Sequence, residues 1–215
     1  MANDTKHEKK RKHWLFWVLV VGVPMLALVF VVVVVGAGLL LEYTSKDLPV
    51  SEAEWDVVID AQDVAAWVDG MAVNRRSETL SKVRFFDFSY EVAYEYEDDH
   101  DGIYINHTLN VERKASDALA TYAPLWAATK AGFLIGGEGS DITVEEHDVF
   151  FQWGDQSRFA VLHNNGEPFG NLFIARKRKR VVFLILAGVY FDEPELWEAF
   201  VTPSLEASEA YDPDK

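Results

Sequence analysis

The stretch VRFFDFSYEVAYEYE at residues 83–97 decides the fold class, because its large apolar residues fall on every second position. This alternation runs over eleven residues, at Phe86, Phe88, Tyr90, Val92, Tyr94 and Tyr96. A period of two is typical of a long β-strand with one buried face. The turn-forming sequence DDHDG follows at residues 98–102, and residues 103–113 predict a returning strand. The sequence therefore predicts a hairpin at residues 83–113.

Beyond this hairpin the sequence predicts a helix, four strands and a second helix. Ser116 is a favourable N-cap for a helix over residues 117–135, which Pro124 should bend or divide. Short apolar or alternating runs then predict strands at residues 143–153, 157–164, 169–176 and 180–188. The last helix starts near residue 192 and should end before Pro203. The order ββαββββα lacks βαβ alternation and predicts an α+β fold, with an antiparallel sheet covered by helices.

The first 41 residues differ from the rest of the chain in charge and in apolar content. Residues 1–13 carry five basic and two acidic side chains, and residues 14–41 carry no charged side chain. An apolar run of 28 residues exceeds the length of about 20 that crosses a bilayer as a helix. It predicts a signal-anchor transmembrane helix, with the basic cluster at residues 9–12 holding the N-terminus in the cytoplasm. A cleaved signal peptide is the alternative, because residues 35–37 loosely resemble a cleavage site.

The predicted organisation follows from this anchor. It comprises a basic cytoplasmic tail (1–13), a transmembrane helix (14–41), a juxtamembrane segment with a short helical lead-in (42–82), an α+β domain (83–209) and a loose tail (210–215). The large domain is expected outside the cytoplasm, at a plasma or inner membrane. Residues 42–215 hold 15 basic and 33 acidic side chains, a net charge of −18 that disfavours nucleic-acid binding. The absence of cysteine excludes disulfides and cysteine nucleophiles.

The order of elements resembles that of PsbP/Mog1-like domains. The features that carry the resemblance are the hairpin, the central helix opened by Ser116, and the strand pair that contains Gly170, Arg176 and residues 181–188 before a C-terminal helix. The resemblance covers about residues 83–208 and is one of topology. Members of that family mostly serve as accessory or assembly proteins on or near membranes, or as binding adaptors. The resemblance therefore implies an accessory, assembly or adaptor role; a shared fold implies no enzyme activity by itself, and no functional residue is carried over.

The strongest local candidate for a binding site is a run of five cations in this acidic region. Its members are Arg176, Lys177, Arg178, Lys179 and Arg180, and they are predicted to form a hairpin tip. Such a tip suits docking on anionic headgroups or on an acidic partner protein. The alternative is that these cations neutralise nearby carboxylates and keep the strand edges soluble.

Two clusters of acids with histidine were considered as metal sites. They lie around His100, at residues 98–101, and around His147, at residues 145–148. Neither has a recognised ligand spacing, so a solvated turn or strand edge is the simpler interpretation. In the second cluster, strand alternation should place Glu145 and His147 on one face. No metal ligand and no cofactor is assigned.

Six aromatic residues between 150 and 173 suggest either an apolar ligand pocket or ordinary core packing, namely Phe150, Phe151, Trp153, Phe159, Phe169 and Phe173. No nucleophile elbow, metalloprotease motif, phosphate loop or dinucleotide fingerprint occurs, so no catalytic residue is assigned and the protein is not expected to be an enzyme. The sequence predicts a membrane-anchored binding, accessory or assembly module with a protein partner. The alternative is a domain that binds or senses a small ligand or a metal ion.

Overall fold

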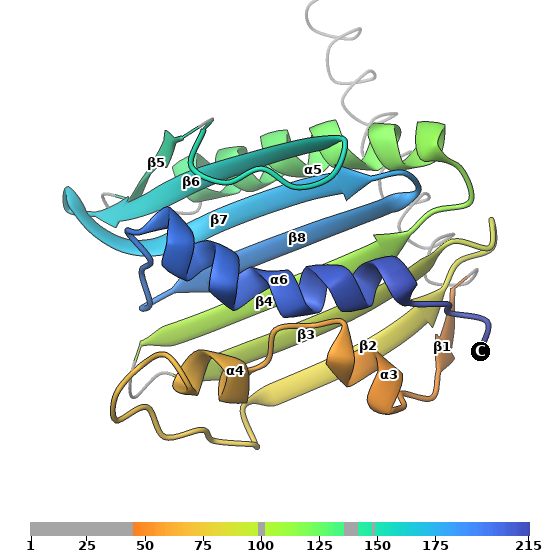
Figure 1. Ribbon diagram of the computed structural model, residues 1–215, viewed down its shortest axis with the longest axis horizontal. Helices are drawn as coiled ribbons and strands as arrows, with labels where there is room; N and C mark the ends of the chain where they lie inside the picture. The colour runs from red at the N-terminus through yellow and green to blue at the C-terminus, as the bar shows by residue number, and fades with distance from the viewer. Residues whose placement is uncertain (1–44, 99–101, 136–141, 148) are drawn as a thin grey trace, which may run out of the picture. The chain divides into compact units, whose positions relative to one another are not determined.

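A single antiparallel sheet of eight strands organises the folded unit Lys46–Lys215. The computed structural model describes residues 45–98, 102–135, 142–147 and 149–215 (Figure 1). The strand order is β1-β2-β3-β4-β8-β7-β6-β5. The strands are β1 (Lys46–Leu48), β2 (Glu78–Arg84), β3 (Tyr90–Asp98), β4 (Ile103–Val111), β5 (Ile142–Glu146), β6 (Gln156–Asn164), β7 (Glu167–Lys177) and β8 (Arg180–Ala187).

Helices cover both faces of this sheet. The short helices α3 (Glu52–Asp56) and α4 (Ala61–Ala65) lie with α6 (Pro194–Ala210) on one face, and α5 (Ala115–Ile135) lies on the other (Figure 1). The larger core forms under α6, where Trp197 is fully buried against Phe159 and Phe173. A smaller core under α5 contains Tyr122 and Trp126. Each face of the sheet is thus buried by the apolar side of a helix, as a layered fold requires.

The predicted fold class is wrong in the number and order of its strands. The structure has eight strands where the sequence predicted six, because β1 and β2 precede the predicted hairpin. The expected long strand over residues 83–97 contains only the last two residues of β2, then a turn, and then β3, which pairs with β2. Between them the chain reverses at Asp87, whose carboxylate accepts hydrogen bonds from the backbone N–H and the hydroxyl of Ser89. The alternation of aromatic residues continues through this turn and conceals it.

The two prolines expected to interrupt helices do not do so. Helix α5 passes through Pro124, and α6 passes through Pro203 to end at Ala210. A proline inside a helix costs about 3 kcal/mol. After Pro203, however, α6 buries Ser204, Leu205 and Ser208, and full burial of a leucine alone recovers about 1.5–3 kcal/mol. The hydroxyl of Ser204 also donates to the carbonyl oxygen of Val57 at 2.9 Å, so tertiary contacts outweigh the local preference.

The membrane anchor is the other part of the prediction that lacks support. No helix among the described residues is long and apolar enough to cross a bilayer. The predicted transmembrane helix at 14–41 and the basic tail at 1–13 lie outside those residues. The anchored, single-pass architecture is therefore corrected to a folded unit that begins at Lys46. Residues 46–82, predicted as a lead-in, supply two strands and two helices to that unit.

Candidate functional site

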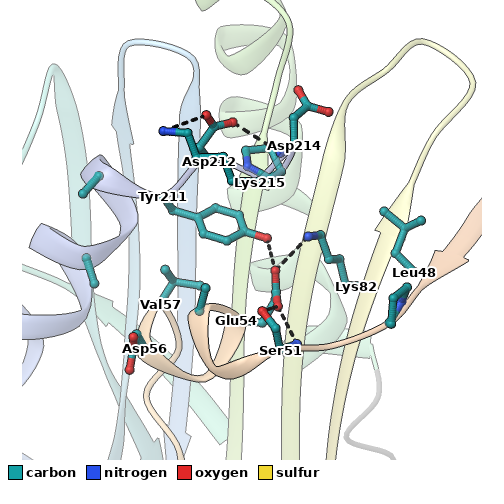
Figure 2. Close-up of a pocket in the computed structure, with 15 residues that line it drawn as sticks. Leu48, Ser51, Glu54, Asp56, Val57, Lys82, Tyr211, Asp212, Asp214 and Lys215 are labelled. Carbon is teal, nitrogen blue, oxygen red and sulfur yellow. Dashed lines mark hydrogen bonds and ion pairs between the residues drawn. The ribbon is translucent and has the colours of Figure 1, made fainter.

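A groove of about 630 Å³ lies where α3, β2 and the end of α6 meet. Figure 2 shows the side chains that line it. The lining comes from residues 48–57, Lys82 and residues 207–215, and most of it is apolar, with Leu48, Pro49, Ala53, Val57, Ala207 and Pro213 among its members. The acidic residues Asp56, Asp212 and Asp214 also line the groove, and all three are exposed to solvent.

A buried carboxylate, that of Glu54, is the centre of the polar contacts in this groove. The residue is 1% exposed and lies in the first turn of α3. One carboxylate oxygen accepts from the backbone N–H and hydroxyl of Ser51, at 2.7 and 2.6 Å. The other accepts from the hydroxyl of Tyr211 at 2.5 Å and from Lys82 Nζ at 2.8 Å (Figure 2). Three parts of the chain that are far apart in sequence therefore meet at one carboxylate.

The pKa values of these groups follow from this geometry. Burial alone would raise the pKa of Glu54, but hydrogen bonds from Lys82, Ser51 and Tyr211 outweigh it and lower the pKa to about 2. Burial, together with the hydrogen bond to Glu54, raises the pKa of the Tyr211 hydroxyl. Glu54 is therefore ionised and Tyr211 is protonated at neutral pH. Neither group is poised to transfer a proton near pH 7.

The C-terminal segment closes one side of the groove. Tyr211 and Pro213 are buried, and the hydroxyl of Tyr90 donates to the carboxylate of Asp214. The guanidinium of Arg180 donates to the carbonyl oxygens of Ser208 and Tyr211, at 2.7 and 2.8 Å. These contacts hold residues 210–215 against the domain, which differs from the loose tail that the sequence predicted.

The five-cation run forms the predicted hairpin tip between β7 and β8. Three of its members bind within the domain: Arg176 pairs with Asp155 at 3.1 Å, Lys177 pairs with Glu209, and Arg180 binds the carbonyls of α6. Arg178 and Lys179 occupy the turn itself and are exposed. Two of the five cations thus neutralise nearby carboxylates, the role that the sequence left open, and Arg180 instead binds backbone carbonyl oxygens. Docking by the tip stays a prediction.

The two acid–histidine clusters are only partly described. Residues 99–101, including His100, and Asp148 lie outside the described part of the chain. Glu145 and His147 lie on one face, as alternation predicted, with His147 Nε2 3.7 Å from Glu145 Oε1. His163, which the sequence analysis did not include, lies 3.7 Å from the other oxygen of Glu145. Within the described ranges, no group of three histidine or acidic residues is arranged to hold a metal ion.

The aromatic residues considered for a ligand pocket are packed into the core. Phe150 stacks on Phe159 with ring centroids 4.1 Å apart, and Phe151 contacts Phe173 at 5.5 Å. Phe159 and Phe173 also pack edge-on against Trp197. The core interpretation is therefore correct for these rings, and the candidate binding groove lies elsewhere.

A second buried polar residue, His107, lies in the middle of β4. Its Nδ1 accepts from the backbone N–H of Ile59 at 2.6 Å, so the ring proton of the neutral form is on Nε2. Burial lowers the pKa of His107 to about 3, and the ring is neutral at pH 7. Nε2 is buried without a hydrogen-bond partner. This arrangement anchors the segment before α4 to the sheet.

Comparison with known proteins does not identify a relative. No family model, no curated protein and no solved structure matches the chain. The resemblance to PsbP/Mog1-like domains therefore stays a prediction, and function has to be argued from the groove itself.

Proposed function

We propose that the folded unit is a non-catalytic binding module that holds an apolar, positively charged segment of a partner protein in the groove beside Glu54. The observation that carries this proposal is the combination of an apolar lining with an exposed carboxylate rim. Apolar surface supplies the driving force for association, and the carboxylates select a partner of opposite charge.

The size and charge of the groove fit such a segment. Its volume of about 630 Å³ is within the range of pockets that hold small ligands or a few side chains. Four carboxylates line it, on Glu54, Asp56, Asp212 and Asp214, against the two ammonium groups of Lys82 and Lys215. Lys82 is committed to Glu54, and Lys215 lies 3.5 Å from Asp212. The charge left for a ligand to meet is negative.

The polar groups inside the groove favour binding over catalysis. Glu54 already accepts from Ser51, Lys82 and Tyr211, so its lone pairs are used within the protein. The pKa shifts of Glu54 and Tyr211 move away from neutrality, whereas a catalytic acid or base needs a pKa near the working pH. We infer that this network fixes the shape of the groove and that exposed residues at the rim meet the partner.

The test is selection from a displayed library of random peptides against the immobilised full chain. We expect enrichment of sequences that combine apolar residues with lysine or arginine. Ala210→Trp places a large ring at the exposed edge of the groove and should abolish binding of the enriched peptides. Ala120→Trp, a change at a residue of α5 that is also exposed, should leave binding intact. Absence of enrichment, or peptides that bind Ala210→Trp as well as the parent chain, would refute the proposal.

A further inference from the structure

Two exposed phenylalanines protrude at one end of the sheet, in the turn between β2 and β3. Phe86 is 66% exposed and Phe88 is 59% exposed, the largest exposed fractions among the phenylalanines of the described chain. Phe88 has φ +68°, a left-handed conformation that is uncommon for a residue with a side chain. The turn is held by the hydrogen bonds from Ser89 to Asp87 and by a backbone bond from Phe85 N–H to Ser89 O at 2.9 Å. The fold therefore maintains an aromatic tip in solvent instead of burying it.

Cations from two other connections gather at this end of the sheet. The β2–β3 turn, the β4–α5 connection and the β7–β8 turn all lie at the right-hand end in Figure 1. Phe88, Arg113 and Lys179 line one small hollow there, of about 200 Å³. The guanidinium of Arg84 lies 4.7 Å from the centroid of the Phe88 ring. The backbone N–H of Glu112 donates to the carbonyl of Lys179 at 2.8 Å and joins the two cationic turns.

The charged side chains at this end of the sheet differ in whether they have partners within the protein. Among the described residues, Arg113, Lys114, Arg178 and Lys179 are exposed, and none forms an ion pair.

The neighbouring carboxylates, in contrast, have donors within the protein. Glu112 accepts from Thr121 Oγ1 at 2.6 Å, and Asp87 accepts from Ser89. Asp214 accepts from the Tyr90 hydroxyl, and Asp212 accepts from the backbone N–H of Asp214 at 3.3 Å and lies 3.5 Å from Lys215 Nζ. These bonds hold the carboxylates in place without removing their charge, so this end of the sheet presents four exposed cations beside the exposed Asp212 and Asp214.

We propose that this end of the sheet docks on an anionic lipid surface, with Phe86 and Phe88 entering the interface and Arg113, Lys114, Arg178 and Lys179 contacting headgroups. Protruding aromatic rings beside lysine and arginine suit the headgroup boundary of a bilayer, where apolar burial and attraction to anionic lipids add together. A tip that protrudes fits a deformable lipid surface better than a preformed pocket on a rigid partner. The folded unit also begins at this end of the sheet, at Lys46, which pairs with Arg84 of β2.

The test uses the full chain, which contains no cysteine and can be labelled at one introduced position. Phe86→Cys places an environment-sensitive fluorophore on the tip, and Glu167→Cys places the same label at the start of β7, beside the β6–β7 turn at the opposite end of the sheet. The variants are mixed with phosphatidylcholine vesicles, with or without phosphatidylserine, that contain a lipid-borne quencher. We expect quenching of the label at 86 only when phosphatidylserine is present, with loss of the effect at high salt.

Two further results decide the proposal. Each substitution of Arg113→Gln or Lys179→Gln should lower the ratio of quenched to unquenched label at position 86 about fivefold, since each cation near an anionic surface contributes about that factor. A label at 86 that stays as water-exposed as the label at 167, or one quenched equally without phosphatidylserine, would overturn the proposal. Protection of the label by an acidic protein, with vesicles leaving it in water, would assign this end to a protein partner instead.

Discussion

The ion pair between Glu54 and Lys82 should make the stability of the domain depend on pH in a calculable way. The pKa of Glu54 is lowered from 4.5 to about 2 in the folded state. A difference of 2.5 pKa units corresponds to about 3.4 kcal/mol of stability at neutral pH. Because the folded pKa is depressed, this stability is fully present above pH 4.5 and is lost as the pH falls toward 2. At pH 3 about 2 kcal/mol of it is gone.

The matched experiment is urea unfolding of the parent chain and of Glu54→Gln at pH 7 and pH 3. At pH 7 we expect the substitution to cost about 3–5 kcal/mol, because Lys82 would keep its charge in a site where it is only 10% exposed. Between pH 7 and pH 3 the difference between the two proteins should shrink by about 2 kcal/mol. Subtracting the free energy of unfolding of the variant from that of the parent chain removes the contribution of the many other carboxylates that titrate in the same range.

Glu52→Gln is the control, since Glu52 lies in the same turn of α3 but is exposed to solvent. Glu52→Gln should change the free energy of unfolding by no more than about 0.5 kcal/mol at both pH values. If the difference between the parent and Glu54→Gln were the same at pH 3 and pH 7, the depressed pKa would be refuted. If Glu54→Gln were as stable as the parent at pH 7, the ion pair would contribute nothing to the fold.

Two other predictions test the core and one turn. The pKa of His107 is lowered to about 3, so stability should fall as the pH drops below 6.5, and His107→Gln should reduce that loss by about 2 kcal/mol between pH 7 and pH 5 in the same assay. Gly154→Ala should lower the thermal midpoint more than Gly166→Ala does. Both glycines have positive φ, but an added Cβ lies 2.5 Å from the carbonyl oxygen of Arg176 only at Gly154. Equal decreases in the thermal midpoint would show that the contact with Arg176 does not affect stability.

Periodicity in the sequence predicted strands well where a buried apolar run is bounded by turns. Strands β6, β7 and β8 lie within two residues of their predicted starts and ends, since each is a buried apolar run bounded by a turn. The same reasoning failed at residues 83–97, where the aromatic alternation passes through a turn. Phe86 and Phe88 keep the period of two, yet they lie outside the strands and in solvent. A pattern of side chains cannot by itself distinguish a continuous strand from two strands joined by a tight turn.

The groove could not be predicted from the sequence, for a different reason. Ser51 and Glu54 form a capping box, whose three-residue spacing is a local feature of the sequence. The partners that turn this cap into a buried ion pair are Lys82 and Tyr211, and the latter is 157 positions from Glu54. Their meeting depends on the register of β1 against β2, which pairs Leu48 with Lys82, and on α6 continuing beyond Pro203 to carry Tyr211 into place. The local preference of Pro203 predicted that the helix would end there. Tyr211, which completes the site, was therefore predicted to lie in a loose tail.

The C-terminal segment connects the two proposed surfaces. Asp212, Pro213 and Asp214 line the groove beside Glu54 and also line the hollow beside Phe88 and Arg113. The segment is held between them by Tyr211 on one side and by the bond from Tyr90 to Asp214 on the other. A peptide in the groove would therefore lie next to the end of the sheet that we propose to dock on lipid. Tyr90→Phe, which removes the bond to Asp214 and keeps the ring, should loosen this segment and weaken peptide binding, while Tyr104→Phe, on the same sheet but remote from the groove, should not. Equal affinities in both variants would show that the groove does not depend on the position of its C-terminal wall.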